Sequence, residues 1–282
     1  MRDDVGKLIG MSAWFALEDL EEACASLSAL GCEGMSIVYT QVASRLIPAP
    51  VFEAHYAAAG ELVREAGLIV STLNVIEDPP AFDPFTSDEA MMHTARRLSQ
   101  HLRDAVAMGA PGILIWDGRV SDEEQAGRAS RELAECVGRA RELAGAASDA
   151  VQVSVELHPF TFALKYRKLE ELAAALPDVG AGICVDFCHF GVALGGDFLD
   201  VLPAQVMDGV SEVHYSDTDC ATSEFHFPAG RGKLDLAALE SHFRGRHLPV
   251  GLDLFQWPAP RSGARTAWPQ FSSFVRAQLA TV

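Results

Sequence analysis

The sequence has no long apolar segment and few basic residues for its length. No apolar run approaches the roughly 20 residues of a membrane-spanning helix, so we expect no transmembrane segment. Lys and Arg number 22 against 39 Asp and Glu, and the net charge is −17. Because nucleic-acid binding needs a basic surface that displaces counterions, we expect neither a nucleic acid nor an anionic membrane as a partner.

A secretion signal and a paired-cysteine motif are also missing. The chain begins MRDDVGKLIG, where acids follow the first arginine and no apolar core appears, so we expect no signal peptide. The six cysteines are scattered without a CxxC pair, which is typical of free thiols in a reducing compartment. These features together predict a cytoplasmic protein.

No GxGxxG segment follows the first apolar run, which argues against a dinucleotide-binding fold, and no low-complexity linker divides the chain. Eight short apolar runs alternate instead with longer amphipathic stretches. The runs cover residues 7–14, 32–39, 68–76, 112–118, 151–158, 181–188, 210–217 and 249–257. Apolar spacing and end signals predict helices over 17–31, 87–109, 121–145 and 234–244. Eight strand–helix units predict an α/β fold, a (β/α)₈ TIM barrel, as a single domain over residues 1–282.

Two kinds of local signal lie within these helices. Ser87, Asp235 and Ser121 stand where N-caps are expected, and Glu124 completes a capping-box pattern with Ser121. A basic cluster in the helix over 87–109 is expected on a solvated or interface surface. Its members are His93, Arg96, Arg97, His101 and Arg103.

Acids and histidines end the last four predicted strands. In a TIM barrel, the carboxyl ends of the strands form the active-site face. One such residue alone is usually a turn cap or a satisfied core group, but four strands in succession favour a shared site. The residues are Glu156 and His158, Asp186 and His189, His214 and Asp217, and Asp253.

One subset of these residues suits a divalent metal ion. Glu156, Asp186, His214 and Asp253 supply three carboxylates and one imidazole, a set that favours Mg²⁺ or Mn²⁺ and also accepts Co²⁺ or Zn²⁺. Cys184 faces the same side as Asp186, but we expect it in the core.

Four motifs in this order resemble one known family. They are VELHP at 155–159, VDFCH at 185–189, VHYSD at 213–217 and PAGRGKLDLAALE at 228–240. The whole chain is similar to the xylose isomerase-like TIM barrels, also called the sugar phosphate isomerase/epimerase family. The resemblance implies that Glu156, Asp186 and His214 bind the metal and that His189 contacts substrate or moves a proton. Asp253 stands where the family has a glutamate ligand, so a second base there loses reach.

The resemblance implies catalysis by proton abstraction next to a metal-bound carbonyl, through an enediolate. The candidate catalytic residues are Glu156, His158, His189 and Asp253. The first expected function is an isomerase or epimerase of a small polyhydroxylated carbonyl compound. The segment ELHPFT also resembles the 3-dehydroshikimate dehydratase branch, so a lyase, including an inosose dehydratase or a C-glycoside deglycosidase, stays open.

Several further residues are candidates for binding the small-molecule substrate. Besides His158 and His189, these are Arg231 and the aromatic side chains of Trp116 and Trp14. Arg231, in the segment GRGK, either holds an anionic group or is a solvated loop residue. More aromatic residues are expected near the mouth of the barrel, namely Phe15, Tyr39, Phe187, Tyr215, Phe255 and Trp257. A non-catalytic ligand-binding barrel and an endonuclease IV-type enzyme are the two weaker alternatives. Among partners, a homo-oligomer stays open.

Overall fold

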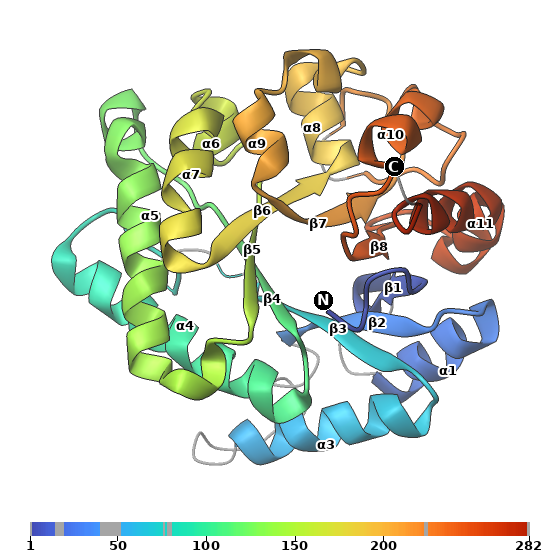
Figure 1. The fold of residues 1–282 in the computed structure, drawn as a ribbon, viewed down its shortest axis with the longest axis horizontal. Helices are drawn as coiled ribbons and strands as arrows, with labels where there is room; N and C mark the ends of the chain where they lie inside the picture. The colour runs from blue at the N-terminus through green and yellow to red at the C-terminus, as the bar shows by residue number, and fades with distance from the viewer. Residues whose placement is uncertain are drawn as a thin grey trace.

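Eight parallel strands, paired in sequence order, form the centre of the computed structural model (Figure 1). The structure describes residues 2–14, 20–39, 52–75, 77, 81–222 and 225–280, with the backbone alone for 52–54. The last strand pairs with the first and closes the barrel. The strands are β1 (Ile9–Met11), β2 (Gly34–Val38), β3 (Ile69–Val75), β4 (Gly112–Trp116), β5 (Gln152–Glu156), β6 (Ala181–Asp186), β7 (Val210–Tyr215) and β8 (Val250–Leu252). Each lies within one of the eight predicted runs, so the predicted barrel is confirmed.

Helices surround the strands as an outer ring (Figure 1). They are α1 (Leu20–Leu30), α3 (Phe52–Glu65), α4 (Asp88–Met108), α5 (Glu123–Ala144), α6 (Phe162–Lys165), α7 (Leu169–Ala175), α8 (Phe187–Leu194), α9 (Ala204–Asp208), α10 (Leu236–Phe243) and α11 (Pro260–Ala277). Short 3-10 turns are η1 (Ser12–Trp14), η3 (Ala146–Ser148), η4 (Pro177–Val179) and η5 (Phe198–Val201). Among the described helices, none combines the length and apolar character needed to cross a membrane.

The helix starts follow local capping signals, with one correction. Ser87 caps α4 and Asp235 caps α10, each through a side-chain oxygen that accepts backbone N–H bonds, as predicted. The predicted cap of α5 at Ser121 is wrong by one residue. Asp122 takes this place because its carboxylate accepts the N–H three residues further on, at Gln125. A carboxylate at this position also interacts favourably with the helix dipole.

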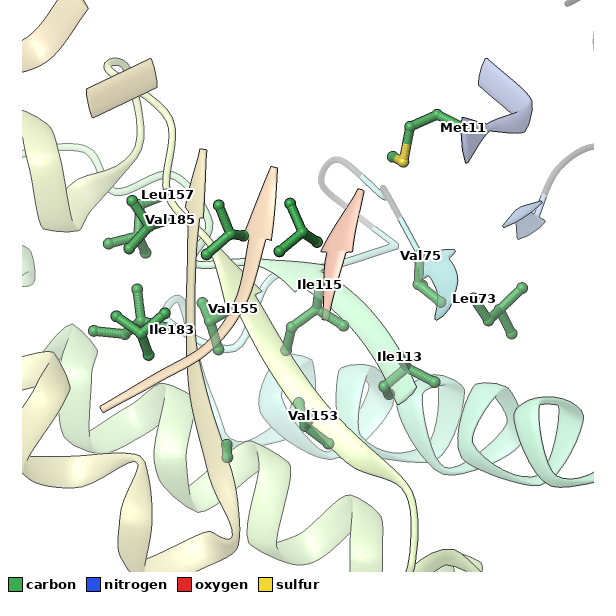
Figure 2. Packing of buried hydrophobic residues seen from close by; sticks show 14 of the residues in the cluster. Met11, Leu73, Val75, Ile113, Ile115, Val153, Val155, Leu157, Ile183 and Val185 are labelled. Atoms are coloured by element: carbon green, nitrogen blue, oxygen red, sulfur yellow. The ribbon is translucent and has the colours of Figure 1, made fainter. Parts of the chain in front are cut away.

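The two faces of the barrel strands differ in chemistry. Side chains such as Ile113, Val153 and Val155 are fully buried in the apolar layer of the sheet, and Figure 2 shows them along their strands. Alternate residues of a strand point to the opposite side, so Glu156 on β5 faces into the barrel. Burial of the apolar layer stabilises the fold, and the opposite face carries the polar groups described below.

A buried ionic network corrects the prediction for one member of the basic cluster of α4, His101, whereas His93 and Arg96 are exposed as expected. Arg97 donates to the carboxylate of Glu77, which lies just beyond β3 and is 3% exposed in its side chain. The ring of His101 lies 3.5 Å from the same carboxylate and is 9% exposed, so this histidine is not on the solvated surface. Burial raises the pKa of Glu77, but hydrogen bonds from His101 and Arg97 outweigh it and lower that pKa from 4.5 to about 2.

Replacing Glu77 by glutamine is expected to destabilise the fold at neutral pH. The loss should be roughly 2 kcal/mol, because a charged hydrogen-bond acceptor is removed from a buried site. Since the pKa of Glu77 is lower in the folded state, its contribution is present above pH 4.5 and disappears as the pH falls through about 2. Urea denaturation at pH 7 and at pH 3 measures the difference.

The exposed pair Lys168–Glu171 provides the control for this change, since the Glu171 side chain is 54% exposed. Glu171→Gln should leave the unfolding free energy nearly unchanged at both pH values. An equal effect of the two substitutions at pH 7 would contradict the assigned role of Glu77.

Candidate metal centre and active site

Four acidic and histidine side chains meet at the carboxyl end of the barrel. Glu156, Asp186, His214 and Asp253 are all buried, and each offers one ligand atom within 4.8 Å of the other three. The Nδ1 atom of His214 lies 2.7 Å from Glu156 Oε1, 3.6 Å from Asp186 Oδ2 and 4.0 Å from Asp253 Oδ2. These are the four residues predicted as metal ligands, and the closure of the barrel brings them together.

The aspartate of the motif VDFCH is fixed by the helix that follows it. Asp186 ends β6 and is also the N-cap of α8, where its Oδ1 accepts the backbone N–H of His189 at 3.0 Å. The D-x-x-H spacing therefore matches the distance from an N-cap to the third helical residue. The second oxygen, Oδ2, is buried and makes no hydrogen bond to any described residue. It faces the shared centre instead.

Opposite charges offset the burial of the cluster. Burial opposes ionisation of Glu156, but His214 and His158 beside it hold the pKa of the carboxyl well below its usual range. Burial likewise lowers the pKa of His214, but Cys184 and Glu156 raise it well above the ordinary value of 6.5. A divalent ion at the same place would supply positive charge to these carboxylates in place of the imidazole proton.

A further histidine, His226, belongs to the site and was missed in the sequence. It lies in the segment after β7 and not at a strand end, where an antiparallel bridge between Asp217 and Phe227 folds the chain back. Its N–H bonds to the carbonyl of Phe255, and its ring Nδ1 lies 3.3 Å from Asp253 Oδ2. The one available signal was a histidine shortly before the glycine-rich segment at 228–240.

Rings of histidine and aromatic residues continue the site outward. His158 lies 3.9 Å from His189 and 4.4 Å from Trp116, measured between ring centroids. His189 lies 5.0 Å from His226. The Thr161 hydroxyl donates to the carbonyl of His158 and accepts its N–H, so this turn fixes the segment ELHPFT.

A cavity of about 490 Å³ lies over the cluster. Its lining includes Glu156, His214 and Asp253, the neighbouring histidines described above, and Trp116, Phe160 and Phe255 as aromatic walls. Arg119 brings a positive charge to the lining and lies 4.6 Å above the ring of Phe160. The cavity therefore combines a polar floor with partly apolar walls, as small-molecule sites commonly do.

Two predicted substrate-binding residues lie away from this lining, as far as the described residues show. Trp14, in η1, is 9% exposed and packs in the apolar core. Arg231 is exposed on the loop that carries the glycine-rich segment. That loop is held by Asp217, whose carboxylate accepts N–H bonds from Gly230 and Gly232, so Asp217 organises the loop and does not join the cluster.

The other predicted mouth aromatics divide between core, rim and neighbouring sites. Phe187 and Tyr215 are core residues, and Trp257 packs on Phe225 and Phe227. Tyr39 lines a separate cavity beside α4. Phe15 lies outside the described residues.

The donor set and its unpaired atoms fit a metal ion. Besides Asp186 Oδ2, both ring nitrogens of His226 are buried without a hydrogen bond to described residues. Ligands about 2.0–2.2 Å from one ion lie about 3–4 Å apart. Of the three distances from His214 Nδ1, only the one to Glu156 then has to lengthen. Asp186 also belongs to a second group with Cys188, His189 and His226.

Comparison with known proteins assigns the family. A profile described as xylose isomerase-like TIM barrel matches residues 24–266. The chain belongs to the xylose isomerase-like TIM barrel family. A search of curated protein sequences found no significant match. The resemblance stated from the motifs is thereby confirmed for the family.

Solved structures share the fold of this family member at low identity. A sugar phosphate isomerase/epimerase from Parabacteroides distasonis is 12% identical, with a TM-score of 0.69 and 96% of both chains covered. The IOLI protein with a bound zinc atom is 14% identical, with a TM-score of 0.70 and 98% and 100% covered. Endonuclease IV from Thermus thermophilus is 18% identical, with a TM-score of 0.65 and 94% and 98% covered. The chain spans 42% of another match, a fusion of such a barrel with 4-hydroxyphenylpyruvate dioxygenase.

Two groups of side chains that share Glu156 and His214 could hold an ion: one adds Asp186 and Asp253, and the other adds Cys184. Two substitutions distinguish them. Asp186→Asn keeps the cap of α8 but removes the charge at Oδ2. Metal affinity should fall at least about a hundredfold, since even partners outside the coordination sphere cost about ten- to a hundredfold. Cys184→Ala should leave affinity unchanged, because burial raises the pKa of its thiol far above the ordinary value of 9.0.

Competition with a chromophoric chelator measures both affinities on the purified protein. Loss of metal in Cys184→Ala together with retention in Asp186→Asn would reverse the assignment and place the ion on the thiol side of Glu156.

Proposed function

We propose that this protein is a divalent-metal-dependent isomerase or epimerase of a small polyhydroxylated carbonyl compound. The observation that carries the proposal is the convergence of four candidate ligands, Glu156, Asp186, His214 and Asp253. All of them except Asp186 also line a cavity that presents further histidine side chains. Three carboxylates and one imidazole suit Mn²⁺ or Mg²⁺, and also accept Co²⁺ or Zn²⁺. The similar structures of an isomerase/epimerase and of a zinc-bound protein support the same class.

A bound ion supplies Lewis-acid polarisation of the substrate carbonyl, which makes the neighbouring C–H more acidic. The chain then has to supply a base. His189 suits this task because burial, together with the neighbouring His158 and His226, lowers its pKa to about 4, although Asp186 opposes the shift. Its ring is therefore neutral at pH 7 and can accept a proton. His158, stacked on His189 and contacting Glu156 at 3.4 Å, can hold a substrate hydroxyl or pass the proton on.

A lyase of the same family is the second candidate, favoured by the surroundings of Asp253. Its Oδ1 accepts the N–H of Phe255 at 2.8 Å, and its Oδ2 contacts His226. Because both oxygens of Asp253 already contact neighbouring groups, we do not assign it as a second base. The remaining candidate bases in the cavity are histidines. One base suffices for a 1,2-proton shift or for removal of a β-hydroxyl group after proton abstraction, whereas many epimerisations use two.

The two weaker alternatives make different demands. A DNA-repair enzyme needs a surface that tolerates the phosphate backbone, and the net charge of −17 opposes this. A non-catalytic barrel would have no need for a neutral, buried imidazole beside a carboxylate cluster. Cleavage of an abasic duplex, or the absence of both metal and turnover, would favour these alternatives.

Solvent exchange tests the shared first step. The Mn²⁺-loaded protein in D₂O should introduce deuterium next to the carbonyl of its substrate, tested with ketoses, an inosose and 3-dehydroshikimate. Product NMR then separates isomerisation or epimerisation, in which the product has the formula of the substrate, from dehydration, in which the product has lost one water. A conversion without any deuterium in substrate or product would contradict proton abstraction.

His189→Gln should keep the metal and lose turnover. The substitution leaves the backbone N–H that caps Asp186 in place, and the loss of a general base should lower kcat by about 10²–10⁴-fold. His242→Gln, an exposed histidine on α10, serves as the matched control and should retain full activity. Loss of metal together with activity in His189→Gln would assign this histidine to the ion and not to proton transfer.

A further inference from the structure

A buried carboxylate lies beneath the predicted metal ligand His214. Glu212 precedes His214 by two residues on β7, so both side chains face into the barrel. Glu212 is 1% exposed, and its Oε1 lies 3.8 Å from His214 Nε2. The same Oε1 accepts a hydrogen bond from the hydroxyl of Thr72 on β3, 2.9 Å away and 140 residues distant in sequence. Such a residue is costly to bury without a polar partner.

Arg2 approaches Glu212 within the barrel. Its Nη1 lies 3.8 Å from Glu212 Oε2, and its Nη2 donates to the carbonyl of Ser71 and the hydroxyl of Thr72. Gly112 leaves the space for this guanidinium, because a Cβ there would lie 2.7 Å from Nη1. The position of Arg2 is therefore fixed by surrounding groups.

The charge of Arg2 does not by itself explain why a carboxylate is buried at Glu212. The carboxylate of Asp4 already pairs with the guanidinium, with Nε donating to Oδ1 at 2.9 Å, and it also accepts the hydroxyl of Ser71. One guanidinium therefore lies beside two buried carboxylates, and Glu212 can also accept a hydrogen bond from another donor. Two buried nitrogens without a hydrogen bond to described residues lie 3.8 Å from this carboxylate: Arg2 Nη1, near Oε2, and His214 Nε2, near Oε1.

The two nitrogens of His214 face different partners. Nδ1 faces Glu156, Asp186 and Asp253, whereas Nε2 faces Glu212. For Nδ1 to bind an ion, the proton of a neutral imidazole has to be on Nε2, and an acceptor there fixes both tautomer and ring orientation. A shift of under about 1 Å brings Nε2 and Oε1 to hydrogen-bond distance.

We propose that Glu212 is a positioning residue of the metal site: it accepts the Nε2–H of His214 and so presents Nδ1 to the ion, while Arg2 and Thr72 hold Glu212 in place. Because the proposal concerns the same centre, it rests on the proposed function. It adds Glu212, Thr72 of β3 and Arg2 to the residues on which metal binding depends.

Removing the acceptor should weaken metal binding without removing a ligand. Glu212→Leu should lower the affinity for Zn²⁺ or Mn²⁺ by about 10–100-fold, as the loss of an outer partner does elsewhere. Glu212→Gln should recover most of it, because the amide oxygen still accepts the Nε2–H. Asp4→Asn is the matched control: it removes a buried acid on the other side of Arg2, should lower stability, and should keep the affinity within about threefold, inside the scatter of distant substitutions.

Imidazole ¹⁵N–¹H spectra give a readout that a purely structural role would not change. With His214 assigned through His214→Gln, the Zn²⁺-loaded protein should show metal on Nδ1 and an exchange-protected proton on Nε2, and Glu212→Leu should lose the protection. Unchanged affinity and protection in Glu212→Leu, or metal on Nε2, would overturn the proposal.

Failure of the proposed function remains distinguishable from failure of this inference. If the natural chain binds no metal, the function fails, and the metal-free spectra then decide about Glu212. Protection of the Nε2 proton in the natural chain that disappears in Glu212→Leu supports the contact, whereas equal exchange in both rejects it.

Discussion

The carboxylate of Asp186 is held by the first turn of α8 through one oxygen, and its other oxygen is buried without a hydrogen-bond partner among the described residues. The different surroundings of the two oxygens explain how an acid is tolerated in the apolar strand β6. The helix N-terminus satisfies Oδ1 and favours negative charge. Oδ2 is left directed at the imidazoles of His214 and His226. The remaining candidate ligands are arranged around that oxygen by the neighbouring strands.

The interior of this barrel is polar along much of its axis. Above Asp186 lie the stacked rings of His158 and His189, and beneath His214 lie Glu212 and Arg2. Apolar packing of the strands against the helices has to supply the stability that such an interior does not. Part of the polar interior is satisfied by hydrogen bonds within the chain, such as those of Thr72 to Glu212 and of Arg2 to Asp4. Buried atoms without a hydrogen bond to described residues occur both at the proposed ion site, on Asp186 and His226, and beneath it, on Glu212 and Arg2.

Much of the site could be predicted from the sequence because the fold makes strand ends converge. Once eight strand–helix units are recognised, Glu156, Asp186, His214 and Asp253 each occupy the end of a strand, and the closed barrel brings those ends together. His226 could not be placed in this way, because it lies in a long connection whose path depends on the bridge between Asp217 and Phe227. The same limit applies to Arg231, which the sequence offered as an anion ligand and the loop leaves exposed.

By itself, the sequence determined the order of strands and helices, the caps at Ser87 and Asp235, and the residues at the strand ends. These features depend on periodicity and on contacts within a few residues, which a linear pattern records. Tertiary structure alone decided which side chains share the cavity with His214 and that Trp14 belongs to the core. It also decided that Arg2 and Thr72 meet Glu212 inside the barrel. Those contacts join segments that are far apart in the sequence, and only the closed barrel brings them within a few ångströms.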